Sequence, residues 1–143
     1  MTRPESAREI LRRALVRCHD SVVVDELIDV ELSDRERTLL VRGLGEWRGP
    51  ARSGEQMALA LGFESAESLR REASRLAEAI AGRVPLTRPD WTRALLATEV
   101  VFASDVVGSG VDWATTTGLT GVETIQTLRL IQRTLVGVVI RPR

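Results

Sequence analysis

The sequence predicts an all-α fold, a single-domain orthogonal bundle of about six or seven helices spanning residues 1–143. Capping-type patterns recur along the chain, and apolar residues with helical spacing follow each of them. One segment, at about 88–107, is apolar on nearly every side, which is typical of a helix surrounded by other elements. No two alternating segments joined by a tight turn indicate a β-hairpin.

The central helix of this prediction begins after Thr87. Thr87 and Asp90 have capping-box spacing, and Pro89 falls in the first turn, where its missing amide proton costs nothing. We expect neighbours on all sides, so that Leu96→Ala or Phe102→Ala destabilises the fold by about 2–5 kcal/mol. The apolar residues lie on two sides of the helix: Leu95, Phe102 and Val106 on one, and Leu96, Val100 and Val107 on the other.

Four capping residues predict helices before the central one: Thr2, Ser33, Ser53 and Ser65. The predicted helices cover about 5–17, 34–47, 54–61 and 66–81, with Gly62 and Gly82 as stop signals. The helix at 5–17 has an apolar stripe and a basic opposite face. The stripe is Ala7, Ile10, Leu11, Ala14 and Leu15, and the basic face is Arg8, Arg12, Arg13 and Arg17.

The segment 22–32 fits two structures. Three consecutive valines, Val22 to Val24, favour a strand, whereas Val23, Val24, Leu27 and Ile28 also match a helical stripe. A short helix is predicted, because no second strand is evident for pairing and an isolated strand does not persist.

After the central helix, Gly108-Ser109-Gly110 predicts a sharp turn, and 111–119 is expected to be a loop. Thr120 and Glu123 form a capping box that opens the last helix. Gly137 is predicted to end it, and the tail 138–143 to extend along the surface. The inward residues of this helix are predicted to be Ile125, Leu128, Ile131 and Leu135.

The amino-acid composition restricts which partners and which cellular compartment are expected. The 20 basic and 20 acidic side chains cancel, so no global field draws the chain to nucleic acid or to an anionic membrane. All the basic residues are arginine, which is typical of a GC-rich bacterial genome rather than a sign of guanidinium chemistry. The single cysteine fits a reducing compartment, and neither a signal peptide nor a membrane-spanning segment is evident. A soluble, cytoplasmic protein without a membrane partner is expected.

No catalytic residue, cofactor or metal site is predicted. Cys18, His19 and Asp20 are adjacent and would point in different directions, and no other His or Cys can complete a site. The favoured interpretation is a buried cysteine at the end of the first helix. Glu99 and Asp105 lie in the apolar helix, but six residues place them about 120° apart. Structural ion pairing is therefore favoured over catalysis there.

The stretch from Asp20 to Glu36 is strongly acidic, with a single Arg. Its spacing is not that of a calcium loop, which alternates ligands around a central glycine. It could dock a basic partner, but a solvated face opposite the basic side of the first helix is the more common arrangement. Its carboxylates are Asp20, Asp25, Glu26, Asp29, Glu31, Asp34 and Glu36.

Residues 55–71 are similar to a helix-turn-helix unit, in which Ala58 and Gly62 have the expected separation. Gly62-Phe63 followed by Ser65 and Leu69 resembles the turn and second helix of AraC-type regulators. Leu32-Ser33-Asp34-Arg35-Glu36-Arg37 resembles the start of LuxR-type DNA-binding domains. These resemblances imply a DNA-binding unit at about 53–81, whose candidate contacts are Arg70, Arg71 and Arg75.

The loop at 111–119 carries more apolar surface than a loop needs, in Val111, Trp113 and Leu119. Trp113 is a candidate anchor for a protein partner, most simply a second copy of the chain. The alternative is that Trp113 folds back over the end of the central helix and completes the core.

Three functions are ordered by these observations. The first is a small non-enzymatic protein that acts through protein–protein interaction or as an accessory subunit, with Val111, Trp113 and Leu119 at its interface. The second is a helix-turn-helix transcriptional regulator that uses Arg70, Arg71 and Arg75. An enzyme using Glu99 or Asp105 ranks last.

Overall fold

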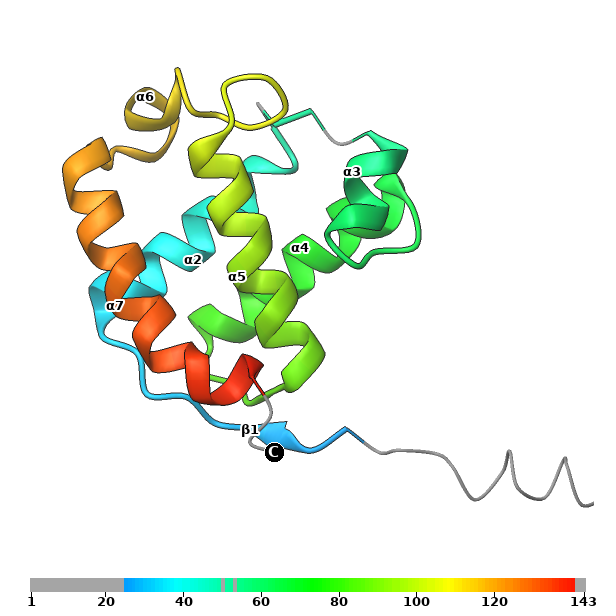
Figure 1. Ribbon diagram of the computed structural model, residues 1–143, viewed down its shortest axis with the longest axis vertical. Helices are drawn as coiled ribbons and strands as arrows, with labels where there is room; N and C mark the ends of the chain where they lie inside the picture. The colour runs from blue at the N-terminus through cyan, green and yellow to red at the C-terminus, as the bar shows by residue number, and fades with distance from the viewer. Residues whose placement is uncertain (1–24, 50, 53, 141–143) are drawn as a thin grey trace, which may run out of the picture.

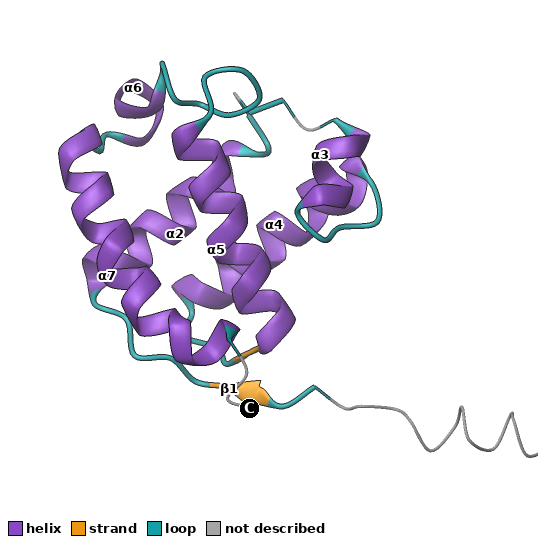
Figure 2. Cartoon of the chain, in the orientation of Figure 1, coloured by secondary structure: helices purple, strands orange, loops and turns teal. Residues whose placement is uncertain are grey.

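The computed structural model describes residues 25–49, 51–52 and 54–140, which form six helices and one small antiparallel sheet (Figures 1 and 2). The all-α class is confirmed for this part of the chain. The helix expected at 5–17 and the segment Cys18 to Asp20 lie outside the described residues. The elements are β1 (Leu27–Ile28), α2 (Asp34–Glu46), α3 (Glu55–Ala60), α4 (Ala66–Ala81), β2 (Leu86–Thr87), α5 (Arg88–Ala103), α6 (Trp113–Thr117) and α7 (Gly121–Val139).

α2 and α5 together form the centre of the bundle, where only the helix at about 88–107 was predicted to be central. α5 and α7 lie in front of α2 and α4 in the view of Figure 1. α2 packs against α4, α5, α6 and α7, and α5 packs against α2, α4, α7 and β2. A Cβ on Gly43 of α2 would lie 2.8 Å from Cγ2 of Thr98 on α5, so a glycine is what allows this close crossing. The indole Nε1 of Trp47 donates to the carbonyl of Ala97 across the same interface, at 3.1 Å.

α5 ends at Ala103 and not at about Val107 as predicted. The following loop folds back and supplies donors to the last turn, since the amide of Ser109 donates to the carbonyl of Val101 at 2.8 Å. A Cβ on Gly108 would lie 2.5 Å from that same carbonyl oxygen, so the loop reaches this position because residue 108 is glycine. One face of α5 stays open, because Leu96 is 38% exposed. The expectation that this helix has neighbours on all sides is therefore wrong for the described residues.

The short helix predicted at 22–32 is wrong for the residues that the structure describes. Leu27 and Ile28 form β1, which pairs antiparallel with β2, Leu27 opposite Thr87 and Ile28 opposite Leu86. The second strand was not evident because two residues are too few to show an alternating pattern. Trp91 reinforces the pairing, because its Nε1 donates to the carbonyl of Ile28 at 3.0 Å.

The capping predictions are confirmed at most helix starts. Ser33 and Thr120 form complete capping boxes with Glu36 and Glu123, and Ser65 accepts from a backbone amide of the first turn of α4. Thr87 accepts from the amide of Asp90, without the reciprocal bond of a box. α3 instead follows Gly54 with no side-chain cap; the predicted cap, Ser53, lies outside the described residues.

Two further boundaries differ from the prediction. The segment expected to be a loop at 111–119 contains the short helix α6. α7 continues through Gly137 to Val139, because the packing of Val138 and Val139 against the core outweighs the roughly 1 kcal/mol that a glycine costs inside a helix.

Arginine side chains cap the ends of four helices. The last carbonyls of a helix lack partners within it and attract donors of positive charge. Long-range pairs meet this need: Arg37 donates to the carbonyl of Ile80 at the end of α4, Arg42 to Thr117 of α6, Arg88 to Val138 of α7, and Arg93 to Gly62 just beyond α3. The arginine content therefore has a structural use that the composition alone did not indicate.

Candidate functional site

The helix-turn-helix-like unit predicted at about 53–81 corresponds to α3, a corner and α4. Gly62 has φ +88°, in the left-handed region that favours glycine, as its role as a stop signal requires. The carboxylate of Glu55, at the start of α3, accepts from the amide of Ala66, at the start of α4, at 3.3 Å. Figure 1 shows the two helices meeting at the right of the bundle, away from α7.

The three candidate DNA contacts lie on the exposed side of α4. Arg75 is held within the protein, because Nε lies 2.7 Å from Glu72 and Nη2 lies 2.9 Å from Asp90 at the start of α5. Partial burial opposes the charged guanidinium, but the hydrogen bonds and negative charges of Asp90 and Glu72 outweigh it and raise the pKa of Arg75. This side chain therefore joins α4 to α5.

Glutamates share the outward side of α4 and its preceding corner with Arg70 and Arg71. Glu64 and Glu67 are exposed at the corner and the first turn of α4, and Glu78 is exposed near its end. Duplex DNA is attracted by a surface of net positive charge, because binding releases counterions from the phosphates. The outward side of α4 is close to neutral and offers little of this attraction.

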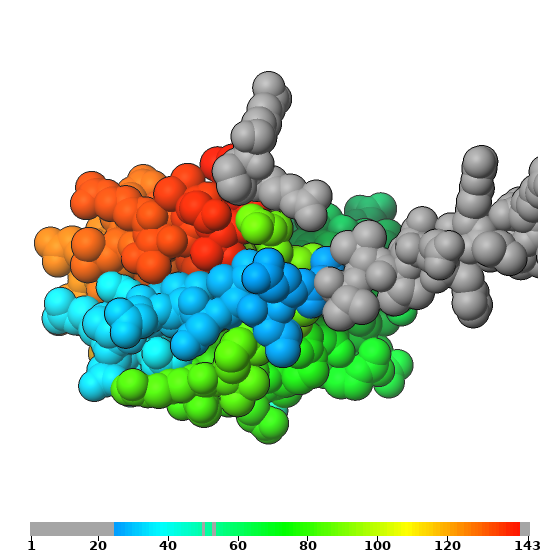
Figure 3. Space-filling view, turned by 90° about the horizontal axis from the view of Figure 1, so that it is seen from below, coloured from blue at the N-terminus to red at the C-terminus, as the bar shows by residue number. Residues whose placement is uncertain are grey.

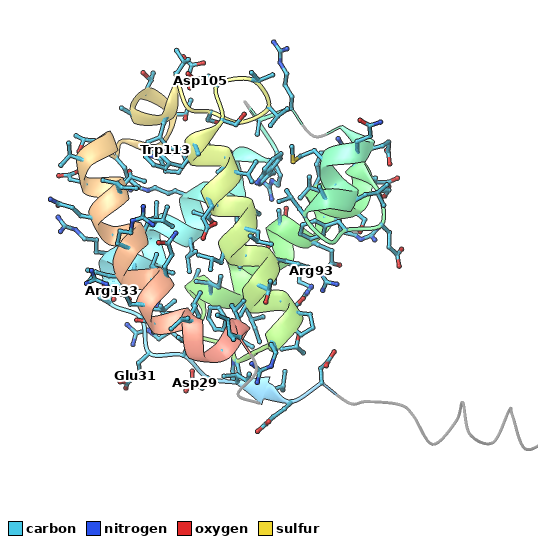
Figure 4. All side chains as sticks on the ribbon, in the orientation of Figure 1. Asp29, Glu31, Arg93, Asp105, Trp113 and Arg133 are labelled. Carbon is cyan, nitrogen blue, oxygen red and sulfur yellow. The ribbon has the colours of Figure 1, made fainter. Side chains whose placement is uncertain are left out.

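Trp113 is part of the core and is only 2% exposed. Its Nε1 donates to the hydroxyl of Thr124 on α7 at 2.8 Å, and its ring meets Phe102 of α5 edge-on, with centroids 5.3 Å apart. Figure 4 shows the side chain between the top of α5 and the start of α7. Of the two alternatives for Trp113, the structure therefore supports completion of the core over an exposed anchor.

Val111 and Leu119, the other two residues of the expected interface, differ in their exposure to solvent. Val111 is 78% exposed, whereas Leu119 is half-buried and packs against the core. With Trp113 buried, Val111 is the only one of the three that is fully available to a partner.

Glu99 and Asp105 do not form a pair. Glu99 is half-buried on α5 and accepts from the side-chain amide of Gln132 on α7 at 3.1 Å. Asp105 is exposed in the loop after α5, at the top of the molecule in Figure 4. The two carboxylates therefore have different surroundings, since Glu99 is bonded to α7 and Asp105 is open to solvent.

Glu46, at the end of α2, is a buried carboxylate that was not predicted, and it is only 6% exposed. It accepts from the hydroxyl of Ser109 at 2.8 Å and so holds the loop after α5 against α2. This buried hydrogen bond links α2 to the loop after α5, which is a structural role. No sequence signal marked it, since the partner lies 63 residues away.

Among the described residues, no group of three or more His, Cys, Asp or Glu side chains could hold a metal ion. No helix in the same part of the chain is both long and apolar enough to cross a membrane.

The outward side of α7 combines exposed apolar side chains with arginines. We call it the outer α7 face and define it by six residues that recur at helical spacing along one side. Apolar side chains lie toward its two ends, and two arginines lie between them; Val136 is 51% exposed although its neighbour Leu135 is fully buried. The face consists of Val122, Ile125, Arg129, Arg133, Val136 and Ile140, each of them exposed.

The charge of this face is of one sign. From Thr124 to Val139 the helix contains no Asp or Glu. Arg129 donates to the side chain of Gln132 on its own helix at 2.9 Å, and Arg133 points away from the bundle (Figure 4). Exposed aliphatic groups around a pair of arginines are typical of protein interfaces, where arginine is enriched and lysine is depleted.

Comparison with known proteins identifies no relative. No family model, curated protein or solved structure matches this chain.

Proposed function

We propose that this protein is a non-enzymatic, cytoplasmic binding module that docks an acidic amphipathic helix of another protein on the outer α7 face. The observation that carries the proposal is the composition of that face, which combines exposed aliphatic side chains with Arg129 and Arg133 and lacks any carboxylate from Thr124 to Val139.

The aliphatic residues supply the binding energy in this proposal. Isolated exposed apolar side chains are normal, but several on one helix indicate a partner surface. Val122, Ile125, Val136 and Ile140 repeat at the intervals by which one helix packs against another. A partner helix that covers them removes apolar area from water, at roughly 25 cal/mol for each Å².

The arginines select the partner. A guanidinium forms two parallel hydrogen bonds with a carboxylate and is weakly hydrated, so it suits a partly buried ion pair. An antiparallel pairing of two copies with full overlap of α7 would place Arg129 against Arg133 of the other copy. Such like-charge contacts oppose association, and for this reason the partner is an acidic helix rather than a second copy.

A pair of synthetic helices tests the proposal. One is an amphipathic peptide of leucines flanked by glutamates, and the other carries lysine at each glutamate position. We expect the acidic peptide to bind at least about tenfold more tightly by fluorescence anisotropy, a difference of about 1.4 kcal/mol. The proposal fails if the two peptides bind equally or if neither binds.

Charge reversal supplies the control. Arg129→Glu with Arg133→Glu should reverse the preference between the two peptides, because the repulsion then acts on the acidic one. The matched variant, Arg70→Glu with Arg71→Glu, changes the same charges on α4 and should leave peptide binding unchanged. Sedimentation of the parent chain shows whether the outer α7 face pairs with itself instead.

A DNA-binding regulator is the second candidate, and the α3–α4 corner with Gly62 in the left-handed region favours it. In that function Arg70 and Arg71 contact phosphates from the second helix of the unit. Gel shifts with random duplex at low salt test it: the parent should be retained, and Arg70→Glu with Arg71→Glu should abolish retention. Absence of retention for the parent rules this function out.

A further inference from the structure

A groove separates the end of α3 from the first half of α5 and the last turn of α7. Its volume is about 340 Å³, and its apolar lining includes Leu61, Pro89, Leu96 and Val139. Leu59 and Ile140 are exposed on the neighbouring turns. This surface is distinct from the outer α7 face and adjoins it only at the end of α7.

The arginines of the groove already have partners. Arg88 donates to the carbonyl of Val138, and Arg93 donates to the carbonyl of Gly62 and to Asp90. Because these charges are satisfied within the bundle, the groove presents mainly apolar surface to an occupant. An acidic ligand would gain little from them.

The first described residues lie beside this groove. β1 begins at Leu27 and pairs with β2, and β2 directly precedes Arg88 and Pro89, which line the groove. The end of α7 lies at the same place, as Figure 1 shows and as the bond from Arg88 to Val138 requires. From below, the chain that leads from β1 into α2 lies between α7 and the end of α4 (Figure 3). The first described strand therefore lies against the strand that leads directly into the groove lining at Arg88 and Pro89.

The segment 5–17 has the pattern that such a groove requires. Its apolar stripe, Ala7, Ile10, Leu11, Ala14 and Leu15, would occupy one side of a helix about 20 Å long. An amphipathic helix of this length is marginal alone and needs a surface on which to bury its stripe. Residues 18–24 can span up to about 24 Å, so the link to Asp25 permits a return along α5, which is itself about 24 Å long.

We propose that residues 5–17 form an amphipathic helix that docks in the groove between α3, α5 and α7 of its own chain. The short link favours the same chain over a second copy, because it holds the helix at a millimolar effective concentration. Charge is compatible with this placement, because the segment carries Arg13 and Arg17 and the described residues beside β1 expose the carboxylates of Asp25 and Glu26. The docked helix covers Leu96, which otherwise stays exposed on the central helix.

Paramagnetic relaxation in the full chain tests the proposal. A nitroxide is attached at Glu9→Cys, on the side opposite the stripe, after Cys18→Ser has removed the only native thiol. Amide signals of Ala60 to Gly62 and of Leu96 should broaden, while those of Val122 and Ile125 at the far end of α7 should not. Broadening confined to other surfaces, or none at all, overturns the proposal.

Two variants and one mixture complete the experiment. Ile10→Asp with Leu11→Asp should abolish the broadening, whereas Arg12→Ser with Arg13→Ser, on the opposite side, should preserve most of it. Circular dichroism and the remaining amide shifts check that each variant stays folded. In a mixture of labelled chains with isotope-enriched unlabelled chains, broadening in the unlabelled ones would show docking between copies and would contradict docking within one chain.

Discussion

α4 and α7 are two long helices that bury similar aliphatic residues but expose different kinds of residue to solvent. Both bury an aliphatic stripe, Leu69, Leu76 and Ile80 on α4, and Leu128, Ile131 and Leu135 on α7. Outside, α4 exposes none of its large apolar residues and alternates arginine with glutamate. α7 exposes aliphatic residues around two arginines and has no carboxylate beyond its first turn.

This difference shows why arginine content alone is a poor guide to a binding site. Arg75 on α4 is neutralised by Glu72 and by Asp90, which belongs to the next helix. Arg129 and Arg133 on α7 have no acidic residue on their own helix from Thr124 onward. The helix that resembles part of a helix-turn-helix unit thus has a balanced surface, whereas α7 exposes apolar residues around two arginines without a balancing carboxylate.

The largest expected effect concerns the residue that holds α7 in place. Trp113→Ala should destabilise the fold by about 3–5 kcal/mol, because it removes a buried indole and leaves a cavity between α5 and α7. Urea denaturation at two protein concentrations measures it. The loss should be equal at both concentrations; a variant of parental stability that loses only self-association would restore Trp113 as an interface anchor.

The inner stripes provide the next comparison. Leu76→Ala on α4 and Leu135→Ala on α7 should each cost about 2–5 kcal/mol, since both side chains are fully buried. Val136→Ala, one residue further along α7, should change stability by less than about 0.5 kcal/mol. If Val136→Ala costs as much as Leu135→Ala, the outer α7 face is covered and cannot receive a partner.

The caps of the two helices should be equivalent. Ser65→Ala and Thr120→Ala each remove the side chain that accepts a first-turn amide, and each should cost about 1 kcal/mol. Ser65→Asp and Thr120→Asp retain an acceptor and serve as controls near parental stability. A loss at only one helix would show that its first turn is held by tertiary contacts instead of its cap.

The smallest expected effect is the difference in stability between variants of Arg75 on α4 and of Arg133 on α7. Arg75→Ala should cost about 0.5–1 kcal/mol, a value reduced by solvent because the side chain is 47% exposed, and the loss should shrink in high salt. Arg133→Ala should have no measurable effect on stability. Because the pKa of Arg75 is raised, the contribution of its pairs is present at all lower pH at which the carboxylates are ionised, and it disappears only at strongly alkaline pH. Equal costs for the two variants would remove the contrast between the helices.

Local sequence determined the helical class, the capped starts at Ser33, Ser65, Thr87 and Thr120, and the left-handed stop at Gly62. These features depend on side chains and amides three or four residues apart, so the information lies within one window of sequence. The resemblance of 55–71 to a helix-turn-helix unit also located the α3–α4 corner, although not the charge balance around it.

Tertiary structure alone decided where long-range partners meet. The pairing of β1 with β2, the early end of α5, the burial of Trp113 and the arginine caps all join residues farther apart than the three or four positions of one helical turn. The outer α7 face was hidden for the same reason. The helical pattern predicted the buried stripe of Leu128, Ile131 and Leu135. It was wrong for Ile125, because the packing of α7 against α2 and α5 leaves this side chain 39% exposed on the outer α7 face.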